Sequence, residues 1–171
     1  SRGVPQDELT KGEKTSETGT TITFLPDADV FDETVFDISI LEQRLRETAF
    51  LTRGLRITLT DEREGGHTPI EFYAEGGIED FVRHLNENKD AIHKKVIYFE
   101  DEGDEGALEI AMQWNSSYQE SVFSFANNIN THEGGSHLSG FRSALTRTLN
   151  KYARDKGEHK EQDDNLSGED V

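Results

Sequence analysis

Apolar residues recur at the spacing of a helix face in several parts of the chain. Two such stripes are made by Ile38, Leu41, Leu45, Ala49 and Phe50, and by Ile78, Phe81, Val82 and Leu85. Asp37 precedes the first stripe as a candidate N-cap, and Gly54 follows it as a stop signal. We therefore predict helices over residues 38–52 and 78–86.

Shorter runs rich in β-branched and apolar residues predict strands. These runs are residues 20–25, 55–60, 70–73, 96–99 and 107–114. The second run alternates apolar and polar positions, and the third can pair back with it. The last two flank an acidic turn and predict an antiparallel hairpin. The pattern indicates an α/β fold, in which helices cover a mostly antiparallel sheet.

The most informative stretch runs from residue 112 to residue 152. Apolar side chains among small polar ones predict one half-buried strand over residues 121–129. A loop with Gly134-Gly135 follows, where positive φ is available. A third helical stripe comes next, with Ser136 or Ser139 as its N-cap candidate, and holds Leu138, Phe141, Leu145, Thr148, Leu149 and Tyr152.

The two ends of the chain are polar. Residues 1–18 predict a loop, and residues 155–165 hold almost no apolar side chain, which predicts an exposed, mobile connection. Ser167 and Asp170 have the spacing of a capping box, which predicts the start of a further helix.

Composition narrows the function classes. The chain has 171 residues, no cysteine and a net charge of −17. This charge argues against nucleic-acid binding by bulk electrostatics, and it suits either an ordinary soluble surface or adaptation to high salt. The absence of cysteine, of a long apolar run and of a secretory signal favours a cytoplasmic protein without a membrane partner.

Few residues carry a chemical signal by spacing alone. Gly76-Gly77 and Gly134-Gly135 each precede a helix and are candidate anion sites, although such pairs are more often simple turns. His132 and His137 match no strong metal signature, so we predict no metal site. The last helix is an exception to the net negative charge, because it carries the basic residues Arg142, Arg147, Lys151 and Arg154. These cations either face phosphates or form an ordinary solvated helix face.

Several longer motifs carry a resemblance to a known family. They are Gln-Trp-Asn at 113–115, Asn-Asn-Ile-Asn-Thr-His-Glu-Gly-Gly-Ser-His at 127–137 and Gly-Phe-Arg-Ser-Ala-Leu-Thr at 140–146. Upstream motifs at 19–27, 44–51 and 75–82 continue it. The chain resembles the B subunit of bacterial-type DNA gyrase and its paralogue in topoisomerase IV, over nearly its whole length.

The resemblance implies a domain plan. Residues 1–27 are the tail end of an ATP-binding domain, residues 28–155 a transducer domain, and residues 156–171 a mobile connection with the start of a truncated helix. The transducer fold of this family is ribosomal-protein-like with a left-handed β-α-β crossover, an exception to the usual handedness. The related subunits continue into a Gln-Thr-Lys loop, a tripeptide absent from this chain.

The resemblance also implies a function. It identifies the chain as a transducer region that relays ATP binding and hydrolysis to DNA strand passage and supercoiling in a type II topoisomerase. Thr20 is then the ATP-binding position, with Ile22 as a pocket wall, and Arg142 faces the DNA cavity. We assign no catalytic residue.

In the parent enzyme the resemblance implies ATP and Mg²⁺ as cofactors, and the gyrase A subunit, DNA and a second B subunit as partners. We expect the isolated chain to be inactive and to need no cofactor, because it lacks the lysine of the Gln-Thr-Lys loop. Two alternatives remain: a stand-alone acidic protein-interaction module of the same fold, and an RNA-binding module, which the net charge disfavours.

Overall fold

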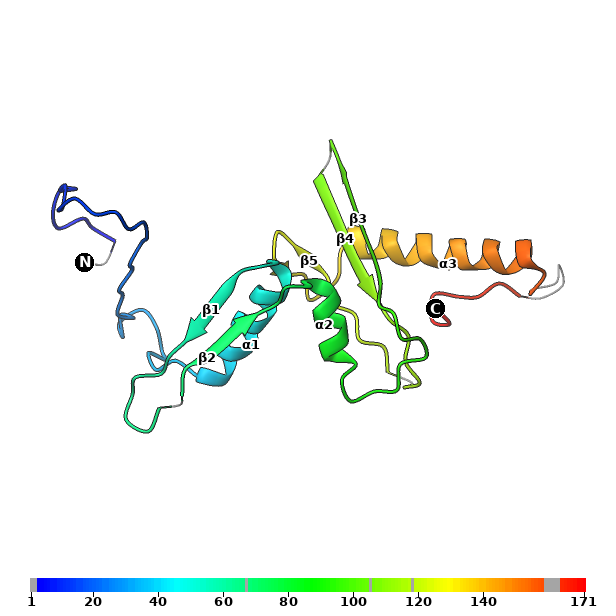
Figure 1. Ribbon diagram of the computed structural model, residues 1–171, viewed down its shortest axis with the longest axis horizontal. Helices are drawn as coiled ribbons and strands as arrows, with labels where there is room; N and C mark the ends of the chain where they lie inside the picture. Colours follow the sequence, from blue (N-terminus) through cyan, green and yellow to red (C-terminus); the bar gives the residue numbers. More distant parts are fainter. Residues whose placement is uncertain (1–2, 67, 105, 118, 159–163) are drawn as a thin grey trace. The chain divides into compact units, whose positions relative to one another are not determined.

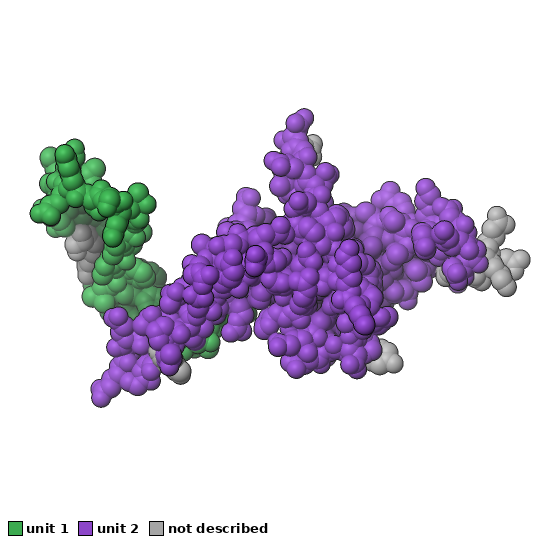
Figure 2. Space-filling view, viewed as in Figure 1, with its two compact units in different colours: residues 1–44 green, residues 45–171 purple. Residues whose placement is uncertain are grey.

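The computed structural model describes residues 3–66, 68–104, 106–117, 119–158 and 164–171. The chain forms two compact units, residues 1–44 and residues 45–171 (Figure 2). Along the chain the elements are α1 (Ile38–Leu51), β1 (Arg56–Leu59), β2 (Ile70–Tyr73), α2 (Ile78–Leu85), β3 (Ile97–Gly103), β4 (Gly106–Met112), β5 (Phe125–Ala126), β6 (Ile129–Asn130) and α3 (Ser136–Lys156) (Figure 1). The three helices fall where the apolar stripes predicted them.

The strands pair as three two-stranded antiparallel sheets, β1 with β2, β3 with β4 and β5 with β6. The α/β class with antiparallel pairing is confirmed. Each strand pairs with its neighbour in sequence, so no helix lies between the paired strands of one sheet. The structure thus has three separate two-stranded hairpins, whereas we expected one larger antiparallel sheet. No sheet among the described residues contains the left-handed β-α-β crossover.

The β3–β4 hairpin is longer than expected. Its register runs from Ile97 opposite Met112 to Gly103 opposite Gly106. The acidic residues Glu100, Asp101 and Glu102 therefore lie in β3 rather than in a turn. Both faces of β3 are exposed at these positions, so all three charged side chains reach water.

The predicted strand at residues 20–25 is wrong. This segment of the first unit is irregular, and its apolar side chains Ile22, Phe24 and Leu25 are largely exposed. Within the part of the chain that the structure describes, these residues make no backbone hydrogen bond. A strand is stabilised by its partner strand, and β-branched composition alone supplies none.

The single strand predicted over residues 121–129 is also wrong. The chain turns at Asn127 and Asn128, whose φ values are 50° and 64°. Two central residues with positive φ are the mark of a tight hairpin turn, and asparagine tolerates this region. The turn sends β6 back along β5, with Phe125 opposite Asn130.

Aromatic rings form the centre of the second unit. Phe81 of α2 stacks on Phe50 of α1 with a centroid distance of 5.1 Å. The Phe81 ring also contacts Phe123 at 5.2 Å and Phe125 at 6.4 Å. Apolar burial and ring contact together stabilise such clusters. The buried apolar side chains of the described residues are Ala49, Phe72, Ala74, Phe81 and Val96.

The helix ends show which capping predictions hold. Asp37 caps α1, because its Oδ1 accepts the backbone N–H of Ser39 over 2.8 Å. For α3 the serine N-cap prediction is wrong: Gly135 occupies the N-cap without a side-chain bond. At the other end Gly157 has φ 74°, and the N–H groups of residues 157 and 158 bond to the carbonyls of Arg154 and Ala153. This is a Schellman end, which favours glycine.

The described residues after α3 run back beside it (Figure 1). Asp170 accepts the backbone N–H of Ser167 at 2.7 Å, and Ser167 Oγ accepts the backbone N–H of Glu169 at 3.2 Å. The bonds from Ser167 lower the pKa of the Asp170 carboxyl, because they favour its charged form. The predicted capping box is thus present in its local bonds, while residues 164–171 form no helix.

Candidate functional site

Thr20, the expected ATP-binding residue, lies in the irregular part of the first unit. Its side chain is exposed, and it makes no hydrogen bond with any described residue. Ile22, the expected pocket wall, is 81% exposed. The described residues of this unit thus leave both side chains open to solvent, and their role stays a prediction.

Arg142, the expected DNA-facing residue, projects from α3. Its guanidinium donates to Glu120 Oε2 over 2.9 Å, and both side chains are about half exposed. An arginine has five N–H donors, so this ion pair leaves most of them available. Glu120 therefore orients Arg142 and offsets its charge without removing its capacity to bind an anion.

A groove of about 500 Å³ opens beside Arg142. Arg142 and Arg147 line it on the side of α3, and Asn165, Leu166 and Gly168 line the opposite side. The groove therefore exists because the returning segment lies along the helix. Its lining joins two arginine residues with hydroxyl and amide residues and with the apolar Leu166, so cationic side chains lie beside a mixed surface.

The other cations of α3 share one face, because Arg147, Lys151 and Arg154 follow at spacings of four and three. Arg154 donates to Asn165 Oδ1 over 2.6 Å. Arg147 and Lys151 form no ion pair or hydrogen bond through their side chains with the described residues. The last helix thus presents charge that the described protein does not neutralise.

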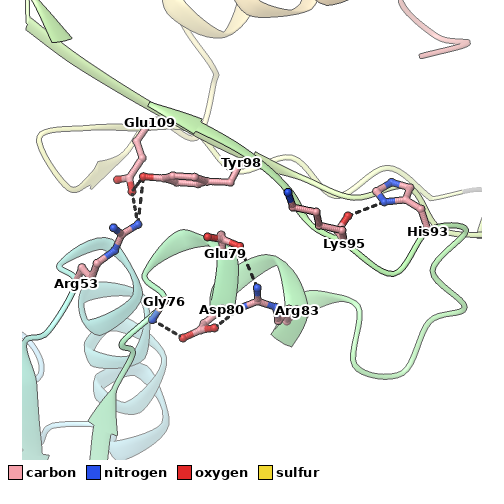
Figure 3. A network of polar contacts seen from close by, with 9 residues as sticks. All are labelled: Arg53, Gly76, Glu79, Asp80, Arg83, His93, Lys95, Tyr98 and Glu109. Carbon is pink, nitrogen blue, oxygen red and sulfur yellow. Dashed lines mark hydrogen bonds and ion pairs between the residues drawn. The ribbon is translucent and has the colours of Figure 1, made fainter. Parts of the chain in front are cut away.

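The candidate anion site at Gly76-Gly77 is filled from within the protein. Asp80 Oδ2 accepts the Gly76 N–H over 2.8 Å, and Arg83 donates to Asp80 over 2.5 Å and to Glu79 over 2.9 Å (Figure 3). A Cβ at Gly76 would lie 2.6 Å from that carboxylate. The Asp80 carboxylate thus occupies the space beside Gly76 and lies at the N-terminus of α2, where the helix dipole favours negative charge.

A second polar network joins the β3–β4 hairpin to Arg53. Tyr98 Oη donates to Glu100 Oε2 over 2.6 Å and to Glu109 Oε1 over 2.8 Å. Arg53 donates to both Tyr98 and Glu109 (Figure 3). The hydrogen bond to Glu100 is the main cause that raises the pKa of Tyr98 to about 12, helped by desolvation and Glu109. No spacing signal predicted this network, because its members are far apart in sequence.

An amide network closes the end of α2 onto the chain after β4. Asn86 donates to Gln113 Oε1 over 2.9 Å and accepts from Asn115 Nδ2 over 2.9 Å. Gln113 also donates to the backbone oxygen of His93 over 2.8 Å. Gln113 and Asn115 belong to the Gln-Trp-Asn motif, so that motif has a clear structural role in holding this loop.

Among the described ranges, no three His, Asp or Glu side chains converge as metal ligands would. None of the helices in those ranges has the length and apolar character that a bilayer crossing requires.

Known proteins resemble the chain in both sequence and fold. The family model described as DNA gyrase B matches residues 77–171. The novobiocin-sensitive gyrase B protein of Streptomyces niveus is 48% identical, over 99% of this chain and 28% of its own length. The gyrase B protein of Streptococcus pyogenes is 52% identical, over 92% of this chain and 24% of its own length.

Solved structures agree. The 43K ATPase domain of Thermus thermophilus gyrase B, in complex with an aminocoumarin, superposes with a TM-score of 0.70 and 32% identity, over 84% of this chain and 39% of that one. The B-subunit of the Myxococcus xanthus gyrase superposes with a TM-score of 0.69 and 29% identity, over 75% of this chain and 36% of that one. The chain spans about a quarter of the length of the curated relatives it matches. With the family model over more than half of its residues and such identities, the chain belongs to the DNA gyrase B family.

Proposed function

We propose that this chain is the transducer region of the ATP-hydrolysing B subunit of a type II DNA topoisomerase. In this role it relays ATP binding and hydrolysis to DNA strand passage and supercoiling. The observation that carries the proposal is the identity of about half the residues to gyrase B proteins across nearly the whole chain. The long α3 with its basic face supports it, because cations gathered on one helix face can contact DNA phosphates.

Two residues receive roles within this proposal. Thr20 contributes to the adenine pocket of the preceding ATP-binding domain, which suits an exposed hydroxyl that has no partner among the described residues. Arg142 faces the DNA segment that the closed subunits enclose. Its free N–H groups and the groove beside it support contact with phosphate.

The partners and cofactors follow from the same role. The parent subunit uses ATP with Mg²⁺, works with the gyrase A subunit and DNA, and pairs with a second B subunit when ATP binds. It acts in the cytoplasm. The chain by itself hydrolyses no ATP, because the sequence holds no Gln-Thr-Lys lysine to stabilise charge on the γ-phosphate.

The test is a supercoiling assay with the full-length B subunit that contains this chain, assembled with its A subunit on relaxed plasmid. We expect ATP-dependent negative supercoiling, which Thr20→Ala weakens by raising the ATP concentration required. The chain alone serves as the control and should release no phosphate above buffer. Failure of the full assembly to introduce supercoils when ATP is present, or turnover by the chain alone that Thr20→Ala abolishes, would overturn the proposal.

A further inference from the structure

Two residues of α3 hold the segment that returns beside the helix. Asn150 donates from Nδ2 to the backbone oxygen of Leu166 over 2.9 Å, and its Oδ1 accepts the backbone N–H of Leu166 over 2.8 Å. One turn later, Arg154 donates to Asn165 over 2.6 Å. Residues 164–168, here called the return segment, are thus attached to α3 at two neighbouring positions.

The chemistry of Asn150 suits this attachment. A primary amide offers a donor and an acceptor side by side, so it satisfies both backbone groups of one residue as a neighbouring strand would. The same Nδ2 also donates to the Thr146 backbone oxygen over 3.0 Å, which fixes the orientation of the amide. Alanine offers neither group, and aspartate keeps only the acceptor.

Among the residues that the structure describes, few other contacts hold the return segment in place. Leu166 is half buried, while the residues on either side of it are exposed. Segments with few buried apolar contacts open at low free energy, so their position depends on a small number of polar bonds. Asn150 makes two of the three bonds described above between α3 and this segment.

We propose that Asn150 is the positioning residue through which α3 directs the polypeptide that follows it. The inference rests on the proposed function, in which this chain is the relay region of a longer subunit. With Leu166 bonded to the helix, a displacement of α3 carries the return segment with it. Without Asn150, the helix moves and the return segment stays behind, so ATP is hydrolysed without strand passage.

The experiment uses the full-length B subunit with its A subunit and compares Asn150→Ala, Asn150→Asp and the control Thr148→Ala. Thr148 is an exposed α3 residue that makes no side-chain bond with the described residues. Amide hydrogen exchange of residues 164–170 reports the attachment, and supercoils introduced per ATP hydrolysed report the coupling.

For Asn150→Ala we expect exchange about tenfold faster at Leu166, unchanged ATP turnover and several-fold fewer supercoils per ATP. Asn150→Asp should lie between alanine and wild type, and Thr148→Ala should match wild type. Wild-type coupling in Asn150→Ala would overturn the inference, and so would an equal loss of ATP turnover and supercoiling. A wild-type assembly without ATP-dependent supercoiling would instead overturn the proposed function, and the inference with it.

Discussion

His93 accepts the backbone N–H of Trp114 at its Nε2 over 3.1 Å, while its Nδ1 donates to the Lys95 backbone oxygen over 2.7 Å. One imidazole therefore connects the chain that enters β3 to the chain that leaves β4. An isolated antiparallel bridge between Ala91 and Asn115 lies beside it. The ring centroids of His93 and Trp114 are 5.8 Å apart, which makes the single tryptophan of the chain a reporter of this contact.

We expect His93→Ala to lower the free energy of unfolding by about 1–3 kcal/mol, because it leaves the part-buried backbone N–H of Trp114 without its partner. Urea unfolding followed by Trp114 fluorescence measures the change. His132→Ala, which removes an exposed loop imidazole, is the matched control and should leave the midpoint in place. An equal midpoint for both variants would show that the His93 bonds do not stabilise the fold.

Tyr98 gives a prediction at alkaline pH. Its folded-state pKa of about 12 lies above the value of 10.0 for a free tyrosine. The neutral phenol thus contributes stability that is fully present below pH 10 and is lost as the pH rises towards 12. The difference in phenolate absorbance between wild type and Tyr98→Phe should therefore rise late in an alkaline titration. In a protein that carries Glu100→Ala, the phenolate absorbance of Tyr98 should appear at a lower pH, because the main cause of its raised pKa has been removed.

Two glycines in and after α3 should respond to alanine in opposite directions. Gly140 lies in the helix interior with open space around it, so Gly140→Ala should stabilise the protein by about 0.5–1 kcal/mol. Gly157 has φ 74°, and Gly157→Ala should cost about 1 kcal/mol or more. Thermal unfolding of the two variants compares them directly. A Gly157→Ala variant as stable as wild type would contradict the assigned end of α3, and a destabilised Gly140→Ala variant would contradict the open helical setting of Gly140.

Glu120 should limit the affinity of the Arg142 surface for DNA, if the proposed function is right. Glu120→Gln removes the opposing charge, and we expect tighter binding of duplex DNA by the full-length protein with a steeper dependence on salt. Arg142→Ala should weaken binding and flatten that dependence. Fluorescence anisotropy over a salt series measures both. Equal salt dependence in the two variants would remove Arg142 from the DNA interface.

Local signals predicted the helices well. The Asp37 cap and the stripes of α1 and α2 act within a few residues, so the sequence around them is sufficient. Strands were harder, because a strand requires a partner. Residues 20–25 have the composition of a strand, but no described segment pairs with them as a partner strand. Asn127 and Asn128 are residues that tolerate a tight turn, but the apolar residues on both sides of them suggested one continuous strand.

The site divides in the same way. Arg142 follows from its motif, but its partner Glu120 lies twenty-two positions earlier and becomes visible only in three dimensions. The Tyr98 network likewise joins Arg53 to Glu109, fifty-six positions apart. The resemblance thus named Arg142 as a candidate, and its role stays a prediction, whereas the groups that orient such side chains depend on the fold.

The ring cluster around Phe81 determines how the chain can be shortened in the laboratory. Its members come from positions 50, 81, 123 and 125, so no piece that ends before residue 125 retains the full cluster. Such a piece would leave the Phe81 ring open to water and prone to self-association. Deletions from the N-terminal end leave this cluster intact as long as they stop before Phe50, because no residue before Phe50 belongs to it.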